Sequence, residues 1–424
     1  MNIADLQKTI NSGKYDKDFS VLYSSINKAR ERYINALSSF TKYFSNKDEI
    51  FMFSAPGRTE VGGNHTDHEL GCVLTGSVDL DVIAIVSKNN DNIVRIKSEG
   101  YPLDEVNIKD LTLKKEEQGK SISLIRGILA YFKENGYKIG GFNAYTTSNV
   151  LKGSGLSSSA AFEVLIGNIL KGLFKNDINA IDIAKISQKA ENNYFGKPCG
   201  LLDQMASSLG GFTAIDFKNL HNPIVEKIDF NLKSYGYSLC IVNTGGNHAN
   251  LTDDYAAITN ECKQISEFFN KDYLREVAEE DFYANILNLR NKFGDRAVLR
   301  AIHFFAENKR AILQAKALRE NNFEEFLKLI TESGNSSFKY LQNVYSTSNT
   351  KEQGLSLGLA LSEKLLKGKG AVRVHGGGFA GTIQCFVPND MLDEFKSEIE
   401  KVFSKDSCFV LNIRPIGGFA FKCD

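Results

Sequence analysis

The amino-acid sequence predicts a mixed α/β protein, of the α+β kind, with two or three domains. Its 424 residues are more than one typical domain contains. Apolar runs typical of buried strands, such as residues 50–55, are interspersed with stretches of helical periodicity, such as residues 162–174. A loop rich in Gly and Ser joins a strand-like run, residues 141–148, to that helical stretch, which indicates a ligand site at a helix N-terminus.

Composition restricts the function classes. The chain has 51 basic residues (Lys and Arg) and 51 acidic residues (Asp and Glu), so the net charge gives no reason to expect a nucleic-acid or membrane partner. The apolar runs are too short to span a bilayer, and the first residues lack the hydrophobic core of a signal peptide. Seven scattered cysteines without a Cys-x-x-Cys pair indicate free thiols. We therefore expect a cytoplasmic protein.

The Gly/Ser loop at residues 151–161 is the strongest candidate for a phosphate site. Gly153 and Gly155 carry no Cβ, so the backbone can approach a ligand closely. Three serines, residues 157–159, stand where a helix presents unpaired N–H groups and the positive end of its dipole. Such a terminus binds phosphate, although a Gly/Ser turn with a Ser cap accounts equally well for this loop taken alone.

Two common phosphate motifs are excluded. A P-loop requires Gly-x-x-x-x-Gly-Lys-Ser/Thr, and Lys114 stands where the first Gly before Gly119-Lys120-Ser121 should be. A dinucleotide fingerprint requires Gly-x-Gly-x-x-Gly between a strand and a helix. The glycines of residues 376–381 have that spacing, but residues 382–387 after them have the pattern of a strand. A Rossmann dehydrogenase is therefore not expected.

A second polar segment, residues 56–71, lies between strand-like runs. Binding residues tend to lie on loops that buried strands position. A metal is not favoured, because the segment has neither a helical His-x-x-x-His pair nor an apparent third ligand. Hydrogen bonding to a polar ligand is the preferred interpretation, and a solvated turn is the alternative for His68 and Glu69. The polar side chains of the segment are Arg58, Glu60, Asn64, His65, Asp67, His68 and Glu69.

A third segment, residues 196–211, contains one acid, Asp203, among small and apolar residues. Burying an acid is costly unless the acid is paired. For this segment taken alone, an Asp that caps a helix is the better interpretation.

Periodicity and turn residues predict the remaining elements. Residues 1–48 are expected to be helical and peripheral, and the strand of residues 50–55 is expected to end at Pro56-Gly57. The other predicted helices are residues 121–135, 180–195 and 391–403, and a mostly helical region at 255–367 with breaks near Gly294 and Gly334. The other predicted strands are 211–217 paired with 224–230, then 237–244, 371–375, 382–387 and segments of 409–421.

Four stretches, in this order along the chain, resemble the motifs of the GHMP small-molecule kinases, and of the galactokinase family in particular. Gly57-Arg58 and Gly63-Asn64-His65-Thr66-Asp67 resemble the sugar-binding signature, and Gly153 to Ala160 resembles the ATP loop. Cys199 to Gln204 corresponds to the segment of the catalytic aspartate, and Gly376 to Gly381 corresponds to the C-terminal glycine loop. The resemblance runs from about Phe51 to the C-terminus.

This resemblance implies a helical extension at residues 1–48, an N-terminal ribosomal-protein-S5-like α/β domain at 49–235, and a C-terminal ferredoxin-like domain at 236–424. The active site would lie in the cleft between the two domains. The implied activity is ATP- and Mg²⁺-dependent phosphorylation of the anomeric hydroxyl of a sugar. The implied roles are catalysis by Arg58 and Asp203, sugar binding by Asn64, His65, Thr66, Asp67, Gly200 and Tyr255, ATP binding by Gly153, Ser154, Gly155, Leu156, Ser157, Ser158 and Ser159, and Mg²⁺ binding by Ser159 and Glu191.

Two positions depart from the galactokinase pattern. Asn64 stands where that family usually carries Glu, and Glu60 stands where it usually carries Asn. Asn64 is expected to contact the C6 hydroxyl of the sugar. Galactose is the expected substrate, with a kinase of galacturonate or N-acetylgalactosamine, or a non-catalytic galactose and ATP sensor, as the alternatives. We expect a monomer that binds the sugar and ATP, and the chain has no Trp to stack on adenine.

Overall fold

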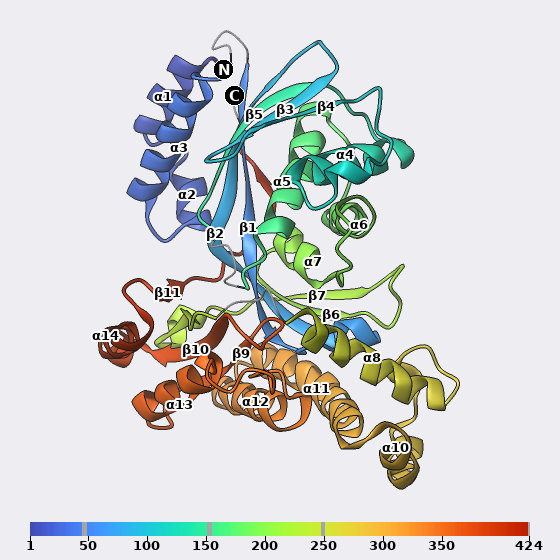
Figure 1. Cartoon of the computed structure of the whole chain (residues 1–424). Helices are drawn as coiled ribbons and strands as arrows, with labels where there is room; N and C mark the ends of the chain where they lie inside the picture. Colours follow the sequence, from blue (N-terminus) through green and yellow to red (C-terminus); the bar gives the residue numbers. More distant parts are fainter. Residues whose placement is uncertain (45–48, 151–154, 247–250, 423–424) are drawn as a thin grey trace.

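The computed structural model describes residues 1–44, 49–150, 155–246 and 251–422. Within these residues the strands form two separate sheets, and helices cover the faces of both (Figure 1). The prediction of a mixed α/β protein is thereby confirmed.

Eight strands in the described part of the chain form the larger sheet. Its order is β12-β1-β2-β5-β3-β4, and β6 and β7 extend it as a hairpin that pairs with β2. Neighbouring strands are antiparallel, apart from the parallel pair β3 and β5. The strands are β1 (Ile50–Gly62), β2 (Cys72–Lys88), β3 (Ile93–Ser98), β4 (Leu103–Asn107), β5 (Phe142–Ser148), β6 (Phe212–Asp216), β7 (Ile224–Ile228) and β12 (Phe419–Ala420).

Strand β1 runs further than the sequence predicts. The pair Pro56-Gly57 does not end it, and the strand continues to Gly62 with register shifts after Pro56 and after Glu60. A β-bulge tolerates a proline because one residue of the bulged strand is left without a ladder hydrogen bond. Arg58 and Glu60 therefore project from a strand and not from a flexible loop.

The N-terminal segment covers one face of the larger sheet (Figure 1). Its apolar residues, such as Tyr33 and Phe40, are buried against Ile85 of β2 and Tyr145 of β5. The sequence predicted a peripheral helical segment, whereas these helices build part of the hydrophobic core. They are α1 (Ile3–Asn11), α2 (Asp16–Leu22) and α3 (Ile26–Phe40).

The opposite face of the larger sheet carries the helices that position the site (Figure 1). Leu165 and Ile169, which are spaced by one helical turn, are buried in the core against this face. The predicted helices at 121–135 and 180–195 are confirmed, the second ending in a π-helical turn, η3 (Glu191–Phe195). The helices are α4 (Ser121–Glu134), α5 (Ser158–Phe174), α6 (Ala180–Ala190) and α7 (Leu202–Leu209).

The smaller sheet is antiparallel, with the order β11-β8-β10-β9. Its strands are β8 (Tyr237–Asn243), β9 (Ala371–His375), β10 (Thr382–Pro388) and β11 (Cys408–Leu411). The helices of this half are α8 (Thr252–Phe268), α9 (Glu279–Ala284), α10 (Ile286–Phe293), α11 (Asp295–Arg319), α12 (Phe323–Ser336), α13 (Gly354–Leu366) and α14 (Leu392–Phe403).

The expected break near Gly294 is confirmed, and near Gly334 the helix α12 ends at Ser336, where the π-helical turn η7 (Ser337–Leu341) follows. Gly294 separates α10 from α11, whereas Gly334 lies inside α12. A Cβ on Gly334 would come within 2.8 Å of the carbonyl oxygen of Val372 in β9. The absence of a side chain at Gly334 therefore allows α12 to pack closely on the sheet.

The last described residues return to the larger sheet, since β12 pairs with β1. The predicted division into residues 1–48, 49–235 and 236–424 stays a prediction.

Among the described residues, no helix combines the length and the apolar character that a membrane span requires.

Candidate active site

The two predicted catalytic residues form an ion pair. Arg58 Nε and Nη2 each lie 2.7 Å from Asp203 Oδ1, although the residues are 145 positions apart in the sequence. Burial alone would raise the pKa of Asp203, but the Arg58 charge and the Ser157 hydroxyl hold that pKa below its usual range. Asp203 is therefore ionised at neutral pH, and its side chain keeps 33% of its surface exposed for a reactant.

The Gly/Ser loop lies directly beside this pair. The Ser157 hydroxyl donates to Asp203 Oδ2, and the Arg58 guanidinium donates to the carbonyl oxygen of Gly155. The backbone N–H of Arg58 also donates to the carbonyl oxygen of Leu156, at 3.1 Å. Gly155 (φ +69°) and Ser157 (φ +54°) both have left-handed backbones at the start of α5. Of the predicted ATP-binding residues, Gly153 and Ser154 lie outside the described residues.

The two predicted metal ligands lie next to one another. Ser159 Oγ, in the first turn of α5, is 3.3 Å from Glu191 Oε1 at the start of η3. The other oxygen of Glu191 accepts from Gln204 Nε2 at 2.7 Å and from the Cys199 thiol at 3.1 Å. Burial raises the pKa of Cys199, which keeps it a neutral donor. Lys197 Nζ lies 3.4 Å from Glu191 Oε1, and the Glu191 side chain is buried.

A buried acid behind this pair was missed by the sequence analysis. Glu163, on α5, is fully buried, and its Oε2 accepts from Gln204 Nε2 at 3.1 Å. Burial and the nearby charge of Glu191 raise the pKa of Glu163 well above its ordinary value, which favours the protonated carboxyl group. The signal was available, because Glu163 is the only acid among the apolar residues of the predicted helix at 162–174.

Three further predicted residues meet the glycine-rich loops from other parts of the chain. A Cβ on Gly200 would lie 2.0 Å from Asp67 Oδ2, so the carboxylate of Asp67 rests on the backbone of Gly200. His65 Nε2 lies 3.0 Å from the carbonyl oxygen of Gly377, and burial lowers the pKa of His65 to about 3. The Tyr255 hydroxyl donates to the carbonyl oxygen of Gly378 at 2.7 Å.

Thr66 does not present its hydroxyl to a ligand. Its Oγ1 donates to the carbonyl oxygens of Gly63, at 2.9 Å, and of Cys72, at 2.7 Å, and the residue is fully buried. The expected contact between Thr66 and the sugar does not agree with this geometry. The side chain closes the turn that carries His65 and Asp67 into position.

Asn64 also points away from any open space. Its Nδ2 donates to Glu60 Oε1 at 2.9 Å and to the carbonyl oxygen of Gly376 at 2.8 Å. Its Oδ1 accepts from Asn343 Nδ2 at 2.9 Å and from Ser337 Oγ at 3.2 Å. These four bonds use the whole hydrogen-bonding capacity of the amide. The expected contact of Asn64 with the C6 hydroxyl is corrected accordingly, because no part of this buried side chain is left for a sugar.

We expect Asn64→Asp to lower the free energy of unfolding by about 2 kcal/mol, because a carboxylate cannot make the two donations of Nδ2 and repels Glu60. Urea denaturation measures the change. Asn288→Asp, at an exposed position of α10, is the control and should change stability little. Equal stabilities of N64D and the unchanged chain would contradict the assigned orientation.

Comparison with known proteins identifies the family. A family profile described as the GHMP kinases N terminal domain matches residues 123–211, and one described as the galactokinase galactose-binding signature matches residues 38–88. The galactokinase of Clostridium beijerinckii is 31% identical over 405 residues, which are 90% of this chain and 97% of that protein. The chain belongs to the galactokinase family. The resemblance inferred from the four motifs is thereby confirmed, and the chain is a sugar kinase of the phosphotransferase class.

Other members of the galactokinase family and its structural neighbours agree. The galactokinase of Glaesserella parasuis is 29% identical over 380 residues, covering 87% of this chain and 93% of that protein. The crystal structure of Lactococcus lactis galactokinase complexed with galactose matches with a TM-score of 0.78 and 26% identity, covering 91% of this chain and 99% of that chain. A mevalonate kinase, 16% identical with a TM-score of 0.60, shares the fold alone, which confirms the GHMP kinase fold.

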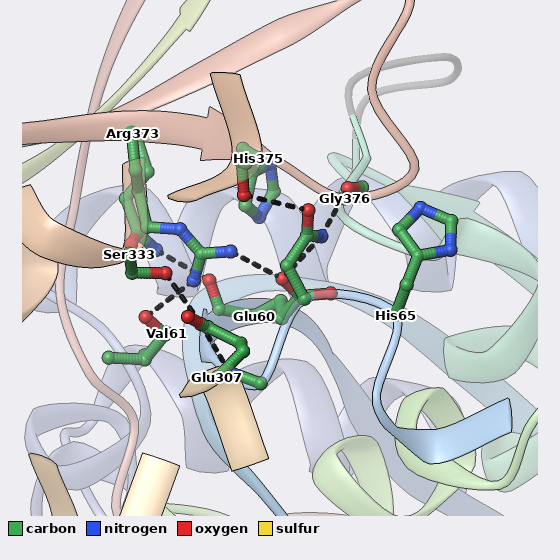
Figure 2. Close-up of polar contacts among 12 residues, drawn as sticks. Glu60, Val61, His65, Glu307, Ser333, Arg373, His375 and Gly376 are labelled. Carbon is green, nitrogen blue, oxygen red and sulfur yellow. Dashed lines mark hydrogen bonds and ion pairs between the residues drawn. The ribbon is translucent and has the colours of Figure 1, made fainter. Parts of the chain in front are cut away.

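One residue that binds the first motif, Arg373, is not among the residues that the galactokinase resemblance implied. Arg373, in β9, is fully buried and lies 312 and 313 positions from the two groups that it binds, the carbonyl oxygen of Val61 and the carboxylate of Glu60. Figure 2 shows Arg373 beside Glu60 and Val61, with Glu307 and Ser333 next to them. The only signal for this contact in the sequence is a charged residue within a predicted strand.

Proposed function

We propose that the chain transfers the terminal phosphoryl group of ATP to the anomeric hydroxyl of galactose, giving galactose 1-phosphate. The observation that carries the proposal is the Arg58–Asp203 ion pair, which lies directly against the Gly/Ser loop through Ser157 and Gly155. This arrangement brings a charged acceptor of hydrogen bonds and a cation to the place where a triphosphate would lie. A non-catalytic sensor of galactose and ATP would not need the Arg58–Asp203 ion pair for its function.

Each residue of the pair has a distinct role in the proposed reaction. Asp203 is ionised and partly exposed, so it can accept a hydrogen bond from the attacking hydroxyl and then take its proton. Arg58 holds the carboxylate in place and can stabilise the negative charge on the phosphoryl group during transfer. The left-handed backbones of Gly155 and Ser157 aim the start of α5 at the phosphates.

Magnesium fits the residues beside the loop. Ser159 Oγ and Glu191 Oε1 are hard oxygen donors 3.3 Å apart, which is the ligand type that Mg²⁺ prefers. Among the described residues no cluster of three or more His, Cys, Asp and Glu could hold a metal, which agrees with an ion bound largely by phosphate oxygens and water. Bound there, the ion would neutralise phosphate charge. Gln204 and Cys199 would keep Glu191 oriented toward it.

We expect Glu191→Gln to raise the Mg²⁺ concentration needed for half-maximal rate by about 10-fold or more, because the site loses an anionic ligand. The galactose KM should not change. Initial rates over a Mg²⁺ titration at fixed ATP measure both quantities. Glu134→Gln, at the exposed end of α4, is the control. An unchanged Mg²⁺ titration in E191Q would contradict the assignment of the ligand.

The substrate is tested with ATP and a panel of galactose, galacturonate and N-acetylgalactosamine. We expect galactose to give the highest kcat/KM. Asp67, His65 and Tyr255 are the side chains that we propose to form the sugar site, around the backbone of Gly200. No phosphorylation of any hexose would contradict the proposed function. A monomeric state and a cytoplasmic location stay predictions.

A further inference from the structure

Glu60 shares a strand face with the catalytic Arg58. Residues 58 to 60 pair regularly with β2, Arg58 opposite Ser77 and Glu60 opposite Thr75. Side chains two positions apart in a regular strand leave the same face, so Glu60 projects toward the side of β1 that carries Arg58. The residue is 8% exposed, which makes it one of the few charged side chains in the core beside the site.

One oxygen of the Glu60 carboxylate is fully engaged. Glu60 Oε1 accepts from Arg373 Nη2 at 2.7 Å (Figure 2). It also accepts from Asn64 Nδ2 at 2.9 Å. Arg373 is itself fixed by its bond to the carbonyl oxygen of Val61, at 2.6 Å. The amide of Asn64 is fixed by its other three partners. The orientation of the Glu60 carboxylate is therefore determined by two immobile donors.

The other oxygen of Glu60, Oε2, receives no hydrogen bond from the described residues. The Glu60 side chain keeps 10% of its surface exposed. Burial raises the pKa of Glu60, Arg373 and Arg58 oppose that rise, and Asp67 adds to it. The charges of Arg58 and Asp67, one predicted catalytic and one predicted sugar-binding residue, thus act on the Glu60 carboxylate.

We propose that Glu60 Oε2 accepts a hydrogen bond from a hydroxyl of the sugar and that its negative charge selects neutral sugars over uronic acids. This inference rests on the proposed function and names a specificity-determining residue for it. A carboxylate that two donors hold in one orientation binds a hydroxyl without further loss of side-chain freedom. A sugar carboxylate in the same place would meet a like charge. Asn64 acts through Glu60, as a positioning residue.

Two variants separate the free oxygen from the charge. Glu60→Gln removes the charge and keeps the length of the side chain. Glu60→Asp keeps the charge beside Arg373 but withdraws the carboxylate by one methylene, so a sugar hydroxyl is no longer within reach. Glu69→Gln is the matched control, because Glu69 is a buried acid of the same segment whose Oε2 accepts from the backbone N–H of Leu274 at 2.9 Å.

Titration calorimetry with galactose and galacturonate gives the binding constants, and thermal unfolding confirms that each variant is folded. We expect E60Q and E60D to weaken galactose binding by about 10-fold to 100-fold, the usual effect of losing a hydrogen bond to a charged group. The preference for galactose over galacturonate should fall in E60Q and persist in E60D. ATP binding should be unchanged in both, and E69Q should bind both sugars as the unchanged chain does.

Galactose binding within twofold of the unchanged chain in either folded variant would overturn the proposal. If E60Q does not fold, E60D decides alone, because it retains a negative charge beside Arg373. Different results would disprove the proposed function and the proposed role of Glu60. A chain with Glu60 intact that phosphorylates neither galactose nor another hexose would disprove the function, whereas activity on galactose with unaltered binding in the variants would disprove only the role of Glu60.

Discussion

Asp203→Asn is expected to lower kcat for galactose phosphorylation by about 100-fold or more. The amide cannot take a proton from the attacking hydroxyl, and it leaves the charge of Arg58 without its partner at 2.7 Å. Asn has nearly the shape of Asp, and the position lies in the first turn of α7 with part of its surface exposed, so the fold should persist. Initial rates at saturating ATP and galactose measure the effect.

The control for this variant is Asp177→Asn, an exposed acid between α5 and α6, which should keep normal kcat. ATP affinity should also persist in D203N, since the phosphate loop is intact. A kcat in D203N within a few-fold of the unchanged chain would remove Asp203 from the chemical step. The ion pair would then be an anchor for the Gly/Ser loop.

The second large effect is expected at Asp81, which joins the N-terminal extension to the larger sheet. Asp81 is fully buried in β2, and its Oδ2 lies 3.0 Å from Arg414 Nη1 and 2.6 Å from the Tyr23 hydroxyl. Arg32 of α3 binds the other oxygen, and Ser54 of β1 donates to Oδ2. One carboxylate thus connects the extension, the central strands and the segment before β12.

Asp81→Asn should lower the free energy of unfolding by about 3–5 kcal/mol, because it leaves the buried charge of Arg414 without its partner. Urea denaturation at neutral pH measures the change. The control is Glu267→Gln, which breaks an exposed pair with Lys263 at 3.7 Å and should have little effect. If D81N lowers the free energy of unfolding by less than about 1 kcal/mol, the buried cluster contributes no more than an exposed ion pair does, which would contradict the prediction.

The pH dependence follows from the same group. Burial would raise the pKa of Asp81, but Arg32 and Arg414 hold it below the ordinary value. A carboxylate whose pKa is depressed by folding stabilises the protein above its unfolded pKa, about 3.9, and that contribution is lost as the pH falls through the folded pKa. The stability difference between the unchanged chain and D81N should therefore shrink as the pH falls below about 4.

Local sequence was sufficient for features whose cause is local. The glycines and serines before a helical stretch predicted a strand, a loop and a helix N-terminus, and α5 begins at Ser158 as that pattern requires. Asp203, the one acid of residues 196–211, is paired with Arg58, which agrees with the cost of an unpaired acid in apolar surroundings. Helical periodicity also predicted α4 and α6 correctly, because each of these helices buries one face and that pattern is visible in the local sequence.

Local sequence was misleading where a distant partner changes the role of a residue. Pro56-Gly57 has the composition of a turn, yet β1 continues through it because β2 pairs along both sides of the bulge. Gly334 itself lies inside α12, where the absence of a side chain allows the helix to approach β9. Asn64 and Thr66 lie in a sugar-binding motif, yet both side chains turn inward to backbone and amide partners.

The sequence by itself determined the family, the order of the motifs and the pairing of residues whose chemistry allows few alternatives. Only the tertiary structure decided which polar side chains of the first motif face the site. Glu60 and Asn64 are four positions apart and equally polar, and sequence reasoning assigned the sugar to Asn64. Arg373 and Gly376, more than 300 positions away, bind one oxygen of Glu60 and the amide of Asn64 and leave the other oxygen of Glu60 free. Hydrogen-bonding capacity is fixed by residue type, but its use depends on partners that folding alone brings together.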